Sequence, residues 1–161
     1  MNKFYSFLVY LLLSFVFISI QISLTTPSFL NLFTPDLNLI LIIYLASANN
    51  IYGSFYLTVI NGLLMDIFSG NMIGIYTLTR LVVYTIIKSS SKTFNINTLK
   101  PKILSILIGT IIFWILLYFV LKFKISEPLN ITLNLIIHQA TINTLVGSLI
   151  FILLGKINAK L

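Results

Sequence analysis

The chain alternates between apolar runs and short polar breaks that contain Asn, Gly, Ser and Pro. The first run and the last two are long enough to cross a bilayer as helices, while the three between them are shorter. We expect the second and third runs to form an antiparallel hairpin, tilted or partly shielded by its neighbours. The predicted spans cover residues 4–24, 37–48, 54–68, 72–87, 103–121 and 131–154.

The breaks between the runs are predicted to be loops, and all four prolines fall in them. The most polar break is 88–102, with four lysines, three consecutive serines and Pro101. The first run is longer than the apolar region of a signal peptide, about 7–15 residues, and no A-x-A site follows it. We therefore expect an anchored helix there rather than a cleaved signal peptide.

The start of the second span has a helix-start pattern. Thr34 is suited to cap a helix, Pro35 to its first position, and the Asp36 carboxylate to the positive end of its dipole. These residues are the predicted beginning of that helix.

Composition assigns the class of protein. Hydrophobic residues make up 58% of the 161 residues and charged residues 8%, against about 25% charged residues in soluble domains. So few charges exclude an ordinary soluble enzyme and a nucleic-acid-binding domain, because they cannot cover a water-exposed surface of this size. Residues 1–161 are predicted to be a single all-α integral membrane domain, a compact bundle of six transmembrane helices surrounded by lipid.

The basic residues predict the orientation. With six spans the two termini share a side, and seven lysines lie there: Lys3, Lys88, Lys92, Lys100, Lys102, Lys156 and Lys160. The opposite side has Lys122 and Lys124. By the positive-inside rule both termini are predicted to be cytoplasmic.

Asp66 and Arg80 are the two charges placed within apolar runs. A charge in the bilayer interior costs several kcal/mol, so such residues are candidates for function. We favour a structural role, either an ion pair between the two or a cap by Asp66 on the turn at residues 69–71. A transport or proton-relay role needs more titratable partners than this chain contains.

Small and polar residues give candidate contacts between helices. Gly62, Asp66, Gly70 and Gly74 recur every four residues, and small residues at this spacing allow helices to approach closely. In the last span, Asn134, His138 and Thr141 form a polar stripe, with Asn143 on a neighbouring face. These side chains are suited to hydrogen bonds between helices.

Catalytic and metal-binding signatures are absent from the sequence. There is no G-x-S-x-G, H-E-x-x-H or P-loop motif and no cysteine. His138 is the single histidine, and no second ligand lies at metal-site spacing. We therefore predict no enzyme activity, no cofactor and no metal.

Residues 61–74 read N-G-L-L-M-D-I-F-S-G-N-M-I-G. This segment resembles the G-x-x-x-D-x-x-S-G-x-x-x-G signature of the rod shape-determining membrane protein family MreD, on Gly62, Asp66, Ser69, Gly70 and Gly74. Leu78 and Tyr84 match the leucine and tyrosine that follow in the next helix. The segments around Pro35 and Asn143 are similar to the family's second and last helices.

The resemblance implies a non-enzymatic subunit of the bacterial elongation machinery in the plasma membrane. Such a subunit binds MreC and acts through it with MreB, the glycosyltransferase RodA and a penicillin-binding transpeptidase. Lateral peptidoglycan synthesis and rod shape depend on it, and no nucleic acid takes part. The resemblance also implies a fold similar to the S components of energy-coupling-factor transporters.

From these residues we expect the 62–74 segment to fix the corner between the third and fourth helices, with a groove there for a partner helix. The alternative is a vitamin-binding S component of such a transporter. That family carries an Ala-x-x-x-Ala face on its first helix, whereas residues 4–24 contain no alanine.

Overall fold

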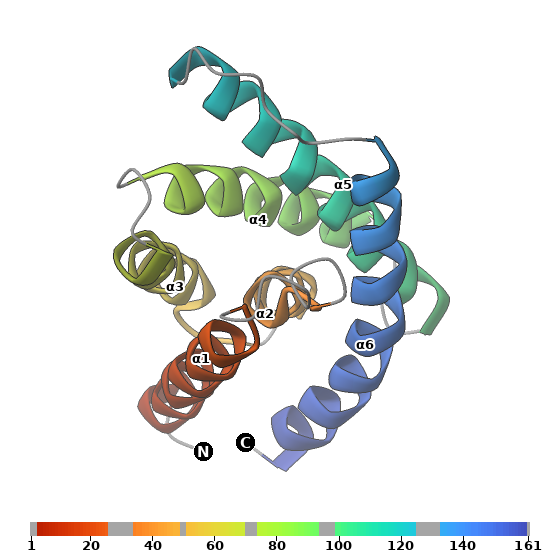
Figure 1. Cartoon of the computed structure of the whole chain (residues 1–161). Coiled ribbons are helices and arrows are strands. Elements are labelled where there is room, and N and C mark those ends of the chain that lie inside the picture. The colour runs from red at the N-terminus through yellow and green to blue at the C-terminus, as the bar shows by residue number, and fades with distance from the viewer. Residues whose placement is uncertain are drawn as a thin grey trace.

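The computed structural model describes residues 3–25, 34–48, 51–69, 74–93, 99–124 and 133–160. Every regular element in these ranges is a helix, which confirms the predicted all-α bundle (Figure 1). The six helices are α1 (Lys3–Thr25), α2 (Leu37–Ser47), α3 (Ser54–Ser69), α4 (Ile75–Thr93), α5 (Leu99–Lys124) and α6 (Leu133–Lys160).

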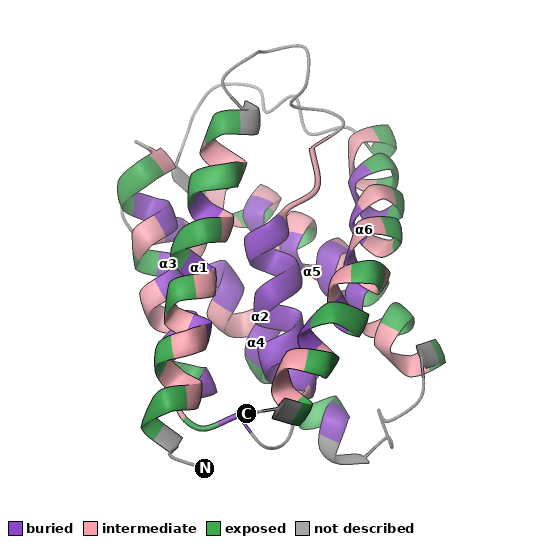
Figure 2. Ribbon diagram, turned by 90° about the horizontal axis from the view of Figure 1, so that it is seen from below, coloured by how far each residue is buried: buried purple, intermediate pink, exposed green. Residues whose placement is uncertain are grey.

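Helix α2 is the centre of the bundle. All eleven of its residues are buried, and it contacts each of the other five helices (Figure 2). The sequence L-N-L-I-L-I-I-Y-L-A-S is apolar on nearly every side, and such a helix is covered either by protein or by lipid. Here the other five helices cover it. The short second run is therefore an internal helix, shielded far more completely than the sequence predicts.

Both ends of α2 have hydrogen-bonding partners. The Asp36 carboxylate accepts a hydrogen bond from the backbone N–H of Leu39 at 2.9 Å and so caps the start of the helix. At the other end, the ammonium of Lys88 on α4 donates to the carbonyl of Ala48 at 3.0 Å. A buried helix requires such partners, because its terminal N–H and C=O groups have none within the helix.

Three of the helices are long and apolar enough to cross a membrane, over Phe4–Ser23, Lys100–Phe123 and Leu133–Ala159. They belong to α1, α5 and α6, and they expose many large apolar side chains on the outside of the bundle. Helix α5 packs along α6, and α3 packs along α4. An apolar exterior, with the few charged and strongly polar side chains of the helices turned inward, is the arrangement of a membrane protein.

Several predicted helix boundaries are wrong. Helix α4 continues to Thr93 and α5 already begins at Leu99, so most of the predicted loop 88–102 is helical, and residues 94–98 lie outside the described residues. Pro101 is in the first turn of α5, where its missing N–H costs no intrahelical bond. Lys122 is within α5, and α6 ends at Lys160 rather than at 154. The length of an apolar run indicates how much of the helix lies in the hydrocarbon layer. The helix itself is longer, because its ends continue into the polar headgroup layer.

The start of α2 also differs from the prediction. Asp36 itself is the N-cap, so Thr34 is not the capping residue and Pro35 lies before the helix rather than at its first position. The helix begins at Leu37, where the predicted span 37–48 starts, and two residues after the first position that the Thr34 cap and Pro35 predicted.

Candidate functional site

Asp66 joins the end of α3 to the start of α4. Its buried carboxylate accepts hydrogen bonds from the backbone N–H groups of Gly74 at 2.9 Å, Tyr76 at 2.8 Å and Thr77 at 3.2 Å, and from the Thr77 hydroxyl. These N–H groups are those that have no acceptor within α4, and they lie at the positive end of its dipole. Asp66 is therefore a cap, as one of the two predictions had it, although its partners are residues 74–77. Gly70 and residues 71–73 lie outside the described residues.

Gly62 allows α3 and α4 to approach closely. A Cβ atom at Gly62 would lie 2.6 Å from the Cα atom of Thr77, so a larger residue does not fit between the two backbones. Gly74 makes no such contact. It has a φ of +99° and nothing within 4 Å of a Cβ position, so it serves the turn and not a helix contact. The Ser69 hydroxyl donates to the Asp66 carbonyl at 3.4 Å.

Arg80 is fully buried on α4 and pairs with Asp36, not with Asp66. Its Nη2 atom lies 3.2 and 3.3 Å from the two carboxylate oxygens of Asp36, and its Nη1 atom donates to the side-chain carbonyl of Asn61 at 2.9 Å. The predicted Asp66–Arg80 pair is wrong because the start of α4 already occupies the Asp66 carboxylate.

Two aromatic rings complete the surroundings of Arg80. The guanidinium carbon lies 5.5 Å from the ring centroid of Tyr76 and 6.0 Å from that of Phe113. Aromatic faces attract a cation, and the carboxylate of Asp36 balances its charge. The charge is thus held in the interior without access to lipid.

The Arg80–Asp36 pair is the middle of a hydrogen-bonded chain that includes every helix. On one side Asn61 donates to Asn38 at 3.0 Å, and Asn38 donates to Gln21 at 2.9 Å. On the other side the backbone N–H of Asp36 donates to Asn143 at 2.8 Å, and Asn143 donates to Thr110 at 3.3 Å. We call these residues the polar chain: Gln21, Asp36, Asn38, Asn61, Arg80, Thr110 and Asn143.

Sequence reasoning found only part of this chain. Gln21, Asn38, Asn61 and Thr110 were not among the expected residues, although each is a polar residue inside an apolar run. On α6, Gln139 and Asn143 are buried in the bundle, while Asn134 and His138 are exposed. The predicted stripe therefore lies on the outer face of α6, because spacing along a helix does not fix its rotation about its axis.

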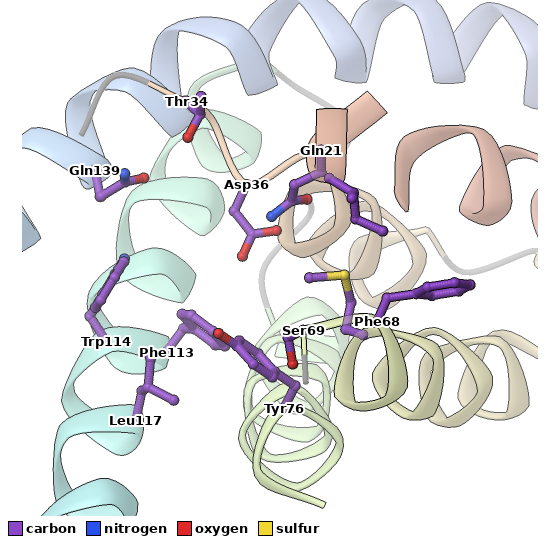
Figure 3. Close-up of a pocket in the computed structure, with 12 residues that line it drawn as sticks. Gln21, Thr34, Asp36, Phe68, Ser69, Tyr76, Phe113, Trp114, Leu117 and Gln139 are labelled. Carbon is purple, nitrogen blue, oxygen red and sulfur yellow. The ribbon is translucent and has the colours of Figure 1, made fainter. Parts of the chain in front are cut away.

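A cavity of about 520 Å³ lies beside Asp36, and two of its lining residues, Tyr76 and Phe113, also contact the Arg80 guanidinium. Figure 3 shows side chains from different helices around it. Its walls include Gln21 of α1, Asp36, Tyr76 of α4, Phe113 and Trp114 of α5, and Gln139 of α6. Trp114 lines this cavity and also packs against the hydrophobic core.

The titratable groups of the described residues do not form a metal centre, since no group of three or more His, Asp or Glu side chains gathers there. Most of the buried polar side chains in the described residues are instead bonded to one another or to backbone groups, while the Tyr10 hydroxyl and Arg80 Nε have no hydrogen-bond partner there. Chemically, such an arrangement fixes the positions of the six helices.

Comparison with known proteins supports the resemblance seen in residues 61–74. The family model described as rod shape-determining protein MreD matches residues 1–158. The comparisons with curated proteins and with solved structures found no match. The expected likeness to transporter S components stays a prediction.

Proposed function

Because this chain belongs to the MreD family of rod shape-determining proteins, we propose that it is a non-enzymatic membrane scaffold that binds MreC in the bacterial elongation machinery. Through MreC it supports lateral peptidoglycan synthesis together with MreB, RodA and a penicillin-binding transpeptidase. It needs no cofactor, and the part of its surface that is not covered by these partners contacts membrane lipid.

The polar chain is the observation that carries this proposal. Seven polar residues from six helices bond to one another, and the only ion pair recorded among the described residues lies at their centre. Apolar contacts alone give little specificity between helices in lipid, whereas buried hydrogen bonds and close backbone contacts do. The interior is thus built to hold one arrangement, which is what a scaffold requires.

We place the partner helix at the corner of α3 and α4. The Asp66 cap and the Gly62 contact fix the angle between these helices, and large apolar side chains face outward beside them. Ile67 on α3 is 65% exposed and Leu78 on α4 is 52% exposed. A single transmembrane helix of MreC packed there would cover this surface.

The orientation we propose has both termini in the cytoplasm and six helices in the plasma membrane. Seven lysines on the terminal side against two on the other favour it by the positive-inside rule. The beginning of α1 and the end of α6 lie at the same end of the bundle, as this orientation requires (Figure 2). The cavity is lined by Gln21 near the end of α1 and by Asp36 before α2, so in this orientation it lies toward the outer side of the membrane.

Affinity purification of the tagged protein from its native membranes, in mild detergent and with mass spectrometry, tests the proposal. We expect MreC and wall-synthesis enzymes to be recovered. Ile67→Trp should reduce the recovery of MreC, while Leu145→Trp, on α6 and 70% exposed, should leave it unchanged. Recovery of an ATPase-linked transport subunit, or of a bound vitamin, would favour the S-component alternative and reject the scaffold.

A further inference from the structure

The cavity beside the Arg80–Asp36 pair has the size and the walls of a ligand site. Its volume of about 520 Å³ lies within the range of 300–1,000 Å³ that is common for small-molecule pockets. A scaffold has no need of such a cavity, and membrane helices that serve only to pack usually fill the space between them.

Flat aromatic faces form one wall. The rings of Tyr76 and Phe113 are stacked with centroids 6.3 Å apart and an interplanar angle of 23°, and Trp114 meets Phe113 edge-on at 6.0 Å. All three rings line the cavity (Figure 3). Such a wall favours a ligand that presents a flat apolar face.

The polar groups around the cavity have unused hydrogen-bonding capacity. Among the described residues, Asp36 Oδ2 accepts one long bond, from Arg80 at 3.3 Å, and the carboxylate is 15% exposed. Gln21 uses its carbonyl for Asn38, whereas its amide Nε2 and the indole Nε1 of Trp114 have no partner within the described ranges. The cavity thus offers an acceptor and two donors to a ligand.

Charge restricts the class of ligand further. Arg80 is fully buried and neutralises Asp36, so the pair gives the cavity no net charge. A cationic ligand would compete with Arg80 for the same carboxylate, and an anionic ligand would face that carboxylate directly. A neutral ligand rich in hydroxyl groups meets neither obstacle, because a hydroxyl both donates and accepts.

We propose that this cavity binds a neutral saccharide, with a sugar ring against Tyr76 and Trp114 and hydroxyl groups bonded to Asp36 and Gln21. The saccharide class rests on the cavity alone. That the saccharide is one of the cell wall, an N-acetylated sugar, rests on the proposed function and on the outward-facing orientation.

The single tryptophan of the chain lines the cavity, so its fluorescence reports occupancy directly. The protein in detergent is titrated with N,N′-diacetylchitobiose, and separately with glucose, choline chloride and sodium acetate. We expect a saturable change in emission with the disaccharide, a weaker one with glucose, and none with choline or acetate. Saturation by choline or acetate alone, or by none of the four, overturns the proposal.

Variants assign the signal to the cavity. Ser69→Leu fills one side of it and should abolish saturation, while Ser105→Leu, on the far half of α5, should not. Trp114→Phe keeps a flat ring but removes the indole donor, and its affinity by calorimetry should fall about tenfold, which corresponds to one lost hydrogen bond. Equal affinity of Ser69→Leu and Ser105→Leu would reject the site. Recovery of MreC by the unchanged protein is scored independently, so failure of saccharide binding does not count against the scaffold.

Discussion

The guanidinium of Arg80 on α4 lies 3.2 Å from the carboxylate of Asp36, the residue that caps the central helix α2. One contact thus neutralises a charge inside the bundle and ties the start of α2 to a neighbouring helix. The same aspartate receives Asn143 of α6 at its backbone N–H. Three helices are joined at one residue.

Arg80→Met should lower the free energy of unfolding by about 3 kcal/mol, because it leaves the Asp36 carboxylate without its counter-charge. The double variant Arg80→Met/Asp36→Asn should recover part of this loss. Unfolding followed by circular dichroism in mild detergent measures both. Losses that simply add in the double variant would show that the two residues are not energetically coupled.

Asp66→Ala should destabilise the protein by about 2 kcal/mol, since the half-buried N–H groups of residues 74, 76 and 77 lose their acceptor. Asp66→Asn keeps one acceptor oxygen and should cost less. We expect the unfolding midpoint to be lowest for Asp66→Ala, higher for Asp66→Asn and highest for the unchanged protein. Equal stability of all three would contradict the cap, and an unchanged recovery of MreC with Asp66→Ala would separate the cap from partner binding.

Glycine-to-alanine changes at two positions should have opposite signs. At Gly62 the added Cβ lies 2.6 Å from a backbone atom of Thr77, so α3 and α4 must separate at a cost of about 1–3 kcal/mol. At Gly155, within α6, nothing lies within 4 Å, and alanine should stabilise the helix by about 0.5–1 kcal/mol. Thermal unfolding of the two variants side by side is the measurement, and a shift in the same direction for both would contradict the close contact.

Two asparagines on α6 differ in burial and so allow a matched comparison of variants. Asn143 is fully buried and bonds to Asp36 and Thr110, so Asn143→Leu should cost about 1–3 kcal/mol. Asn134 is exposed, and Asn134→Leu should change stability by less than about 0.5 kcal/mol. Chemical unfolding in detergent compares them, and a larger loss at Asn134 would mean that α6 is rotated relative to this structure.

The number and order of the helices follow from the sequence, because each apolar run must be helical to satisfy its backbone in lipid. The helix ends do not follow, since Lys88 and Pro101 are compatible with both a loop and a terminal helical turn. Lys88 is helical, and its ammonium donates to the carbonyl of Ala48, the C-cap of α2, a contact that only the packed bundle reveals.

The ion-pair partner of Arg80 could not be predicted from the sequence for a related reason. Sequence reasoning compared charges within apolar runs and so considered Asp66, whereas the true partner, Asp36, precedes its helix. The Asp66 cap was predictable in kind, since an aspartate near a turn commonly accepts from helix N–H groups. The cavity was not, because its walls come from segments as distant along the chain as Gln21 and Gln139.

The enclosure of α2 has a consequence for biogenesis. Its eleven residues extend about 16 Å, roughly half the thickness of the hydrocarbon core, so it does not qualify as an independent span during insertion. One of its walls is α6, which follows it in the chain after α3, α4 and α5. The centre of this protein is therefore completed only after α6 has been synthesised, and until then the core around α2 lacks one of its walls.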